Sequence, residues 1–466
     1  MSGRDDTSDV DLIVLGGGSG GYAAALRAAE LGMRVAVIEK DKLGGTCLHR
    51  GCIPTKALLQ SAEVAETVRE SARFGIRASL DHIDPDGVGR YRDGVVNALF
   101  RGLSGLVAGR GIELIAGTGR LVSPTTVTVT LPDGAERSVS GAHIVIATGS
   151  VPRHIPGITA DGRRIITSDE ALNLDAVPRS AIVLGGGAIG CEFATVWHSF
   201  GADVTIIEAL PHLVPTEEEA ASASLEKAFT RQGISLRLGA KVTDATPSAE
   251  GVTVTLDDGS TLSADLVLVA IGRAPVTEGI GLDTVGLETD RGYLKVDEHC
   301  RTSVPSIFAV GDVIPTLQLA HVGFAEGIMV AETLAGLDPA PIDYPGIPRV
   351  TYSHPEVASV GMTTKMATER GYQVEDVVYD LAGNGKARIL GSSGIVKVVA
   401  AKGGPVLGVH MVGKRVGELI SEAQLIVNWD ARPDEVAQHI HAHPTLSEAV
   451  GEAHLALAGK PLHTHS

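Results

Sequence analysis

Two copies of one glycine-rich unit constrain the fold of this 466-residue chain more than any other feature. In the first copy, an apolar run at residues 10–15 precedes Gly16, Gly18 and Gly21, and a second apolar run ends at Glu39. A strand, a Gly-x-Gly-x-x-Gly turn, a helix and a second strand with a terminal acid predict a dinucleotide site. The glycines make the turn, admit a pyrophosphate and let helix and strand pack closely, while the acid binds a ribose.

The second copy repeats this unit near the middle of the chain. An apolar run at residues 180–184 precedes Gly185, Gly187 and Gly190, and the unit ends at Glu208. In both copies, the acid stands 23 positions after the first glycine. The repeated spacing predicts two dinucleotide sites, and two such sites in a chain with a close cysteine pair indicate electron transfer between cofactors.

The cysteine pair lies in the segment Gly-Gly-Thr-Cys-Leu-His-Arg-Gly-Cys-Ile-Pro-Thr-Lys at residues 44–56. On a regular helix the Cα atoms of Cys47 and Cys52 would lie roughly 8–9 Å apart, whereas a disulfide needs about 7 Å or less. A bonded pair therefore requires a bend, which Gly51 can allow. The pair also fits two small buried side chains or two metal ligands, but zinc normally needs a second close pair. The other two cysteines stand alone, so a redox pair is the leading interpretation.

Composition excludes several classes of protein. The net charge of −17 is opposite to that of a phosphate-backbone binder, and 3% aromatic residues are too few for base stacking. No apolar run approaches the ~20 residues of a membrane span, and the polar, acidic first six residues are unlike a secretory signal. Four cysteines are too few for a secreted disulfide framework. We expect a cytoplasmic enzyme of about three domains, without nucleic-acid or membrane partners.

Two further patterns bear on the fold and the site. Residues 439–448 place His439, His441 and His443 before Glu448. This cluster could bind a metal, form a surface patch, or supply a general base with its orienting acid, and spacing alone leaves all three open. Apolar patterning also predicts a strand at 302–312 and helices at 54–74, 91–108 and 417–429.

Together, these motifs resemble the flavin-dependent pyridine nucleotide–disulfide oxidoreductases. The resemblance covers about residues 10–451 and includes Ala-Thr-Gly at 147–149, Phe-Ala-Val-Gly-Asp at 308–312 and His-Pro-Thr-x-Ser-Glu at 443–448. It implies an α/β fold with two Rossmann-like dinucleotide-binding domains, for FAD and NAD, and a C-terminal α+β dimerisation domain. The implied segments are an FAD-binding domain at 1–150, an NAD-binding domain at 151–272, a central segment completing the FAD domain at 273–342, and a dimerisation domain at 343–466.

The resemblance also implies which residues bind the cofactors. The first fingerprint would hold FAD, with Glu39 at its adenosine ribose, Asp312 at its ribityl–phosphate region and Lys56 beside the flavin, paired with Glu192. The second fingerprint would hold NAD, with Glu208 at the ribose. Further implied cofactor-binding residues are Thr148, Gly149, Gly272 and Ala320.

The implied reaction oxidises a dihydrolipoyl group carried on a protein arm. His443, oriented by Glu448, would take a proton from the substrate at the disulfide of the other subunit, which makes a homodimer necessary. The substrate thiolate would attack Cys47, and Cys52 would leave and pass electrons to FAD, which then gives a hydride to NAD. The implied partners are the lipoyl domains of 2-oxoacid dehydrogenase complexes, in which such an enzyme is a shared component, and no metal is implied.

Other members of the family provide alternatives. An NAD(P)H-dependent reductase of a low-molecular-weight disulfide is the main one, but Glu208 would repel the 2′-phosphate of NADP, and His212 is the nearest basic residue. A mercuric reductase would need a terminal cysteine pair, which the last residues lack. A silent structural or flavin-binding role is opposed by the combined presence of the two cysteines, His443 and Glu448.

One departure from the family pattern lies between the cysteines. This chain has Leu48-His49-Arg50, where the dehydrogenases of the family more often carry Leu-Asn-Val. The two basic side chains either lower the pKa of a neighbouring thiol or face solvent.

Overall fold

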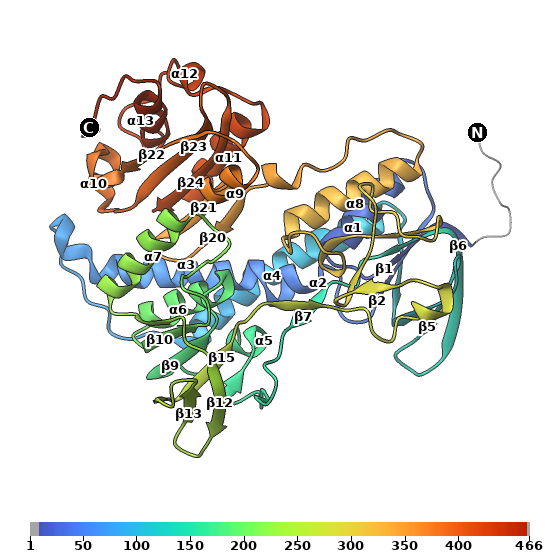
Figure 1. Cartoon of the computed structure of the whole chain (residues 1–466). Helices are drawn as coiled ribbons and strands as arrows, with labels where there is room; N and C mark the ends of the chain where they lie inside the picture. Colours follow the sequence, from blue (N-terminus) through green and yellow to red (C-terminus); the bar gives the residue numbers. More distant parts are fainter. Residues whose placement is uncertain (1–8, 464–466) are drawn as a thin grey trace. The chain divides into compact units, whose positions relative to one another are not determined.

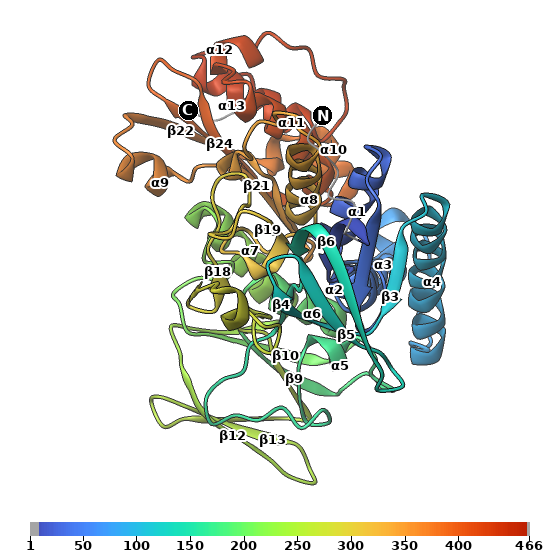
Figure 2. The same ribbon diagram turned by 90° about the vertical axis from the view of Figure 1, so that its right-hand side faces the viewer.

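The structure is a computed structural model that describes residues 9–463. The first six residues, on which the expectation of no secretory signal rests, lie outside this range. Contacts divide the chain into two compact units (Figures 1 and 2). Unit 1 comprises Met1–Ala57, Gly89–Arg153 and Arg273–Tyr344, and unit 2 comprises Leu58–Val88, His154–Gly272 and Pro345–Ser466. The division into four segments at 150, 272 and 342 stays a prediction.

Unit 1 is built on a sheet in the order β3-β2-β1-β6-β5-β4, with β19 paired to β6. The parallel strands are β1 (Val10–Leu15), β2 (Val35–Glu39), β3 (Glu113–Ala116), β19 (Ile307–Ala309) and the second half of β6 (Glu136–Ile146). The first half of β6 instead pairs antiparallel with β5 (Thr126–Thr130), which pairs with β4 (Thr118–Ser123). Glu39 therefore lies at the carboxyl end of the parallel sheet, where α/β folds bind ligands.

The strand predicted at 302–312 is confirmed only over Ile307–Ala309 and is wrong on both sides of it. Only Ile307–Ala309 forms a strand, because the chain turns before it, with the Ile307 N–H donating to the Val304 carbonyl at 2.8 Å. Pro305 lies in this turn and has no N–H for a sheet ladder. The strand is followed by a short 3₁₀ turn, η3 (Gly311–Val313), that carries Asp312.

Unit 2 contains a second parallel sheet in the order β11-β10-β9-β15-β8. Its strands are β8 (Ile165–Ile166), β9 (Ser180–Leu184), β10 (Asp203–Glu208), β11 (Ser235–Leu238) and β15 (Leu266–Val269). Helices α6 (Ala188–Ser199) and α7 (Glu219–Gln232) provide crossovers, and an antiparallel extension is formed by β12 (Val242–Pro247), β13 (Val252–Leu256) and β14 (Thr261–Ala264). The second fingerprint thus joins β9 to α6.

The rest of unit 2 is an antiparallel sheet in the order β20-β21-β24-β23-β22. Its strands are β20 (Arg349–Thr351), β21 (Glu356–Gly361), β22 (Val374–Asp380), β23 (Ile395–Ala401) and β24 (Val406–Gly413). Helices α11 (Val416–Asn428) and α13 (Glu448–Leu457) pack on it through a shared apolar core. The structure thus has two parallel sheets, the first with an antiparallel extension, and a C-terminal antiparallel sheet covered by helices. This is the fold class expected from the sequence.

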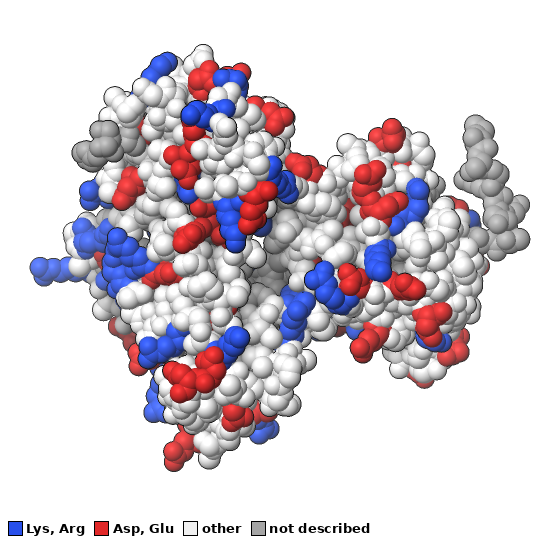
Figure 3. Space-filling view, viewed as in Figure 1, with Lys and Arg blue, Asp and Glu red and all other residues white. Residues whose placement is uncertain are grey.

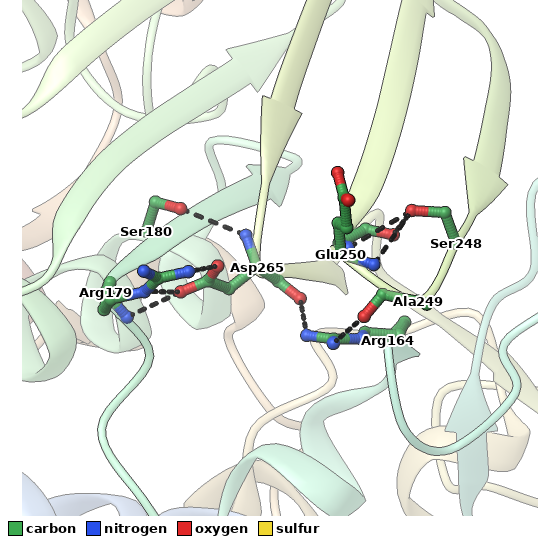
Figure 4. A network of polar contacts seen from close by, with 8 residues as sticks. Arg164, Arg179, Ser180, Ser248, Ala249, Glu250 and Asp265 are labelled. Carbon is green, nitrogen blue, oxygen red and sulfur yellow. Dashed lines mark hydrogen bonds and ion pairs between the residues drawn. The ribbon is translucent and has the colours of Figure 1, made fainter.

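A polar network closes the amino ends of β9 and β15 (Figure 4). Asp265 accepts hydrogen bonds from the Arg179 guanidinium at 3.0 and 3.2 Å, and its N–H donates to Ser180 Oγ at 3.0 Å. Arg164 donates to the carbonyls of Asp265 at 2.9 Å and Ala249 at 2.8 Å, which ties the β12–β13 turn to the sheet. These contacts lie at the amino ends of the strands, whereas nucleotides bind at the carboxyl ends. The network therefore stabilises the fold and does not form part of the nucleotide site.

On the face shown in Figure 3, acidic and basic side chains are interspersed. Among residues 9–463, no helix combines the length and apolar character that crossing a membrane requires.

Helices α1 (Ser19–Glu30) and α8 (Ala320–Leu334) pack side by side in unit 1 (Figure 1). Their backbones approach so closely that a Cβ at Gly327 would lie 2.3 Å from the Gly20 carbonyl oxygen and 2.8 Å from the Ala24 nitrogen. The first fingerprint begins α1, so this packing fixes the helix that follows its glycine turn.

Replacing Gly327 by Ala should therefore lower the free energy of unfolding by roughly 1–3 kcal/mol through overpacking, although Ala favours helix. The matched control is Gly102→Ala in α4 (Pro85–Gly109), where a Cβ would meet nothing within 4 Å. That change should stabilise by about 0.5–1 kcal/mol. Calorimetric unfolding measures both, and equal effects of the two changes would contradict this account of the α1–α8 contact.

Candidate active site

The first glycine turn has the geometry of a phosphate cradle. Gly16 has φ +107°, and a Cβ there would lie 2.3 Å from the Ala147 carbonyl oxygen. A Cβ at Gly21 would lie 1.9 Å from the Gly16 carbonyl oxygen, so helix and turn meet with no room for a side chain. A Cβ at Gly18 would meet nothing within 4 Å, and no side chain caps the helix that begins at Ser19. The open space and the uncapped N–H groups fit a pyrophosphate.

The second turn repeats this geometry residue for residue. Gly185 has φ +109°, and a Cβ there would lie 2.4 Å from the Ala270 carbonyl oxygen. A Cβ at Gly190 would lie 1.9 Å from the Gly185 carbonyl oxygen, whereas one at Gly187 would meet nothing within 4 Å. Helix α6 also begins without a side-chain cap. Both turns therefore fit a dinucleotide phosphate, as their sequences predict.

The two acids at the strand ends are held in the same way. Glu39 accepts hydrogen bonds from the N–H groups of Gly17 at 2.7 Å and Asp41 at 2.8 Å. Glu208 accepts them from Gly186 at 2.7 Å and Leu210 at 2.8 Å. Each carboxylate oxygen uses one acceptor position on the backbone and keeps another for a ribose hydroxyl.

His212, the basic residue nearest to Glu208 in the sequence, lies close to two carboxylates. His212 lies 3.5 Å from Glu226 and 3.8 Å from Glu219. A 2′-phosphate would have to approach these two acids together with Glu208, which is electrostatically unfavourable.

The predicted bend between the cysteines is confirmed. Helix α2 (Gly45–Arg50) ends before Gly51, whose φ of −145° and ψ of −110° break the helix, and α3 (Cys52–Arg69) begins at the second cysteine. The helix expected at 54–74 thus starts two residues earlier. The Thr55 hydroxyl donates to the Gly51 carbonyl at 2.7 Å and fixes this break.

The cysteine segment lies directly on the first glycine turn. The Gly44 N–H donates to the Gly17 carbonyl at 2.8 Å. A Cβ at Gly45 would lie 2.7 Å from the Gly18 Cα, so only glycine fits there. The fold therefore brings Cys47, two residues farther on, to the place where the first fingerprint would hold its cofactor.

The side chains of Cys47 and Cys52 lie within hydrogen-bonding distance of each other. The hydrogen bond with Cys52, followed by burial and the charge of Cys52, raises the pKa of the Cys47 thiol. The charge of Lys56 and a hydrogen bond with the Ser19 hydroxyl act in the opposite direction. Lys56 and Ser19 are thus the groups that favour a Cys47 thiolate.

The basic side chains between the cysteines have contacts of their own. Arg50 forms a surface ion pair with Asp41 at 2.9 Å, with both side chains more than 40% exposed. His49 Nε2 lies 2.9 Å from the Leu43 carbonyl oxygen, and its ring packs edge-to-face on Phe100 with centroids 5.2 Å apart. The solvent-facing alternative therefore holds for Arg50, and His49 has a packing role.

Two residues around Asp312 were not predicted from the sequence. The Ser150 hydroxyl donates to Asp312 Oδ2 at 2.5 Å, and Arg273 Nε donates to Ser150 Oγ at 2.7 Å. Buried Glu326 accepts the Gly311 N–H at 2.6 Å and so fixes the turn that carries Asp312. Ser150 directly follows the Ala-Thr-Gly segment, and Arg273 directly follows the Ile-Gly segment. Their position beside these motifs could have marked them as site residues.

The remaining candidate cofactor residues occupy turns and helix ends. The Thr148 hydroxyl donates to the Val276 carbonyl at 2.6 Å, and the Gly149 carbonyl accepts the Val276 N–H at 2.9 Å. Gly272 has φ +106°, and Ala320 is the first residue of α8. Glu192 is buried on α6 and accepts the Tyr352 N–H at 3.0 Å, while its pairing with Lys56 stays a prediction.

His443 and Glu448 lie together at the start of α13. His443 Nδ1 is 2.8 Å from Glu448 Oε1, and the Thr445 N–H donates to Oε2 at 2.7 Å. Burial alone would raise the pKa of Glu448, but the bonds from Thr445 and His443 and nearby histidine charges hold it below its ordinary value. An ionised Glu448 orients the imidazole with Nδ1–H inward, which leaves Nε2 of the 77% exposed His443 as the basic nitrogen.

Of the three interpretations left open for the histidine cluster, this geometry fits the general base best. Glu422 pairs with His441, at 2.6 Å, and His439 is exposed. In the part of the chain that the structure describes, no group of three or more histidine, cysteine or acidic side chains is placed to hold a metal ion.

The chain belongs to the pyridine nucleotide-disulphide oxidoreductases, which match residues 10–327, and the dimerisation domain of this family matches residues 347–454. The family and the fold class expected from the motifs are therefore confirmed. The dihydrolipoyl dehydrogenase of Bacillus subtilis (strain 168) is 44% identical, over 98% of this chain and 99% of that protein. The mitochondrial dihydrolipoyl dehydrogenase of Pisum sativum is 38% identical, over 99% of this chain and 93% of the relative.

Solved structures agree with this assignment. The structure of LpdA from Mycobacterium tuberculosis has a TM-score of 0.90 and 30% identity, covering 96% of this chain and all of that one. A Cu(II) complex of the HOCl-induced flavoprotein disulfide reductase RclA from Escherichia coli has a TM-score of 0.87 at 26% identity, covering 96% and 99% of the two chains.

The open space at Gly187 provides a test of the second cradle. Gly187→Ala adds a Cβ that meets no protein atom within 4 Å, on extended backbone that Ala adopts readily, so the fold should be unaffected. The added methyl should instead occupy phosphate space and raise the Kd for NADH about tenfold or more. Fluorescence titration measures the Kd, and calorimetry monitors the fold.

Gly190→Ala is the contrasting variant, because its Cβ would lie 1.9 Å from a backbone oxygen and should destabilise unit 2. An unchanged Kd in Gly187→Ala would contradict the cradle assignment.

Proposed function

We propose that this chain is a dihydrolipoyl dehydrogenase, which oxidises protein-bound dihydrolipoyl groups with FAD and NAD. The observation that carries the proposal is the contact of the Cys47–Cys52 segment with the first glycine turn, through the 2.8 Å bond from Gly44 to Gly17. A thiol pair at one dinucleotide turn, in a chain with a second such turn, supports electron transfer from a dithiol to a nicotinamide. Relatives named dihydrolipoyl dehydrogenase at up to 44% identity support this substrate.

The proposed cofactor sites use the residues expected from the resemblance. Gly16, Gly18, Gly21 and Glu39 would hold FAD with Asp312, and Gly185, Gly187, Gly190 and Glu208 would hold NAD. When bound, FAD would accept an electron pair from the cysteine pair and deliver it as hydride to NAD. Glu208 favours NAD over NADP, and the engagement of His212 by two acids supports this preference.

The thiol steps are carried out by the chain's own residues. His443 takes the proton of one substrate thiol, and the resulting thiolate attacks Cys47 Sγ of the oxidised pair, which breaks the Cys47–Cys52 bond. Cys52 leaves as a thiolate. The second substrate sulfur then displaces Cys47, which takes up the proton of that second thiol as it leaves. The substrate becomes a disulfide, and the cysteine pair holds two more electrons. Glu448 keeps the His443 imidazole oriented and stabilises its positive charge.

The proposed quaternary structure follows from the dimerisation domain at residues 347–454. In a homodimer, His443 of one subunit would serve the cysteine pair of the other. The proposed partners are lipoyl domains of 2-oxoacid dehydrogenase complexes, and the cytoplasmic location expected from the sequence stays a prediction.

Cys52→Ser should abolish turnover of dihydrolipoamide, by at least about 10³-fold, because the disulfide exchange needs both sulfurs. FAD should remain bound, since the glycine turn and Glu39 are unchanged. Turnover assays with NAD and with NADP, and the flavin absorbance of the purified protein, measure these effects. The control is Cys300→Ala, a buried cysteine outside the pair that should keep most of the activity. Loss of FAD from Cys52→Ser would show that the cysteine is structural.

The alternative activity, reduction of a low-molecular-weight disulfide, is tested by the same assays. A wild-type enzyme that oxidises NADPH with a small disulfide faster than it reduces NAD with dihydrolipoamide would support that alternative and overturn the proposal.

A further inference from the structure

A second histidine–glutamate pair lies next to His443 in the chain. His441 Nε2 is 2.6 Å from Glu422 Oε1 on helix α11, and the ring also hydrogen-bonds to the main chain of His439. The His441 side chain is only 12% exposed, in contrast to 77% for His443. A ring that faces two acceptors is best satisfied when both its nitrogens carry hydrogen. The contact is therefore a partly buried ion pair when the ring is protonated, with Glu422 36% exposed.

His441 also rests on the helix that carries Glu448. A Cβ at Gly451 would lie 2.5 Å from His441 Nδ1 and 2.8 Å from Cε1, so the ring packs directly on the α13 backbone. Gly451 follows Glu448 by three residues, which is about one helical turn. The ring thus contacts α13 on the turn directly after the acid that orients His443.

We propose that His441, anchored by Glu422, is a positioning residue for the His443–Glu448 pair. His441 stands two residues before His443 in the chain. Its ring also packs on helix α13, which begins with Glu448. A displacement of the ring would therefore move both partners of the 2.8 Å contact. The inference rests on the proposed function, in which His443 is the base.

The charge of His441 adds to this geometric role. The bond to Glu422 raises the pKa of His441, although burial opposes it, so the pair favours the protonated ring. Burial raises the pKa of Glu448, and the charge of His441 is one of the influences that lower it. Burial lowers the pKa of His454 on α13 to about 4, so this neighbour of His441 is neutral. Tyr379, whose pKa is raised to about 12 chiefly by burial, also faces Glu448 and is likewise uncharged. When protonated, His441 thus places a positive charge beside the acid–base pair.

The test compares four variants in the FAD-loaded dimer with dihydrolipoamide and NAD. His441→Gln should lower kcat about tenfold, a part of the 10²–10⁴ that a general base supplies, with KM changed less than about twofold. It should also move the acid limb of the kcat/KM profile to higher pH, because loss of a nearby cation favours protonation of the base. Glu422→Gln should lower kcat in the same direction. The controls, Glu418→Gln on the same helix and the exposed His82→Gln, should leave kcat and the profile unchanged.

Gly451→Ala separates positioning from folding. Alanine favours a helix interior by about 1 kcal/mol over glycine, yet its Cβ would displace the His441 ring. The proposal expects a folded, FAD-containing protein with the lowered kcat of His441→Gln. A wild-type kcat in a folded Gly451→Ala variant, or an unaltered pH profile in His441→Gln, overturns the inference. An inactive wild type would instead overturn the proposed function.

Discussion

The close approach of two glycine backbones is the contact on which the candidate site depends. Gly44 donates to the Gly17 carbonyl at 2.8 Å, and the Gly45 Cα has no room for a side chain against Gly18. Because neither backbone carries a Cβ here, the cysteine segment lies on the phosphate turn itself, and the Ser19 hydroxyl that begins α1 reaches Cys47. A bulkier residue at Gly45 would push the cysteine segment away from the turn, because even a Cβ there would lie 2.7 Å from the Gly18 Cα.

The same structural solution is used twice, with one difference that decides the chemistry. In both parallel sheets, an acid at the end of the second strand accepts the N–H of the middle residue of the glycine turn, Gly17 for Glu39 and Gly186 for Glu208, at 2.7 Å. The first unit then continues into the cysteine segment, and the second continues into the loop in which His212 is engaged by carboxylates. The two phosphate turns are equivalent, but only the first has a cysteine pair beside it. This difference suits one site that receives electrons from thiols and a second site that passes them on.

Local patterns were sufficient to predict the parts of the site that are close in sequence. The glycine spacing predicted both turns, and the separation of the cysteines predicted a bend that Gly51 could allow. The spacing of the histidine cluster left three interpretations open, and only the family resemblance implied that His443 pairs with Glu448. Long-range contacts were not predictable in this way. The hydrogen bond from Ser150 to Asp312 and the one from Arg273 to Ser150 join segments more than a hundred residues apart. The part-buried Glu422–His441 pair joins α11 to a loop 19 residues farther along the chain. The strand expected at 302–312 failed because a single proline turn outweighs an apolar run.

The most direct test of the central claim is stopped-flow absorbance of the FAD-containing protein mixed anaerobically with dihydrolipoamide and then with NAD. If Cys47 and Cys52 relay electrons from a dithiol, a long-wavelength band from a thiolate beside oxidised flavin should form first and decay as NADH is produced. A protein that binds FAD but gives neither the band nor NADH would contradict the account.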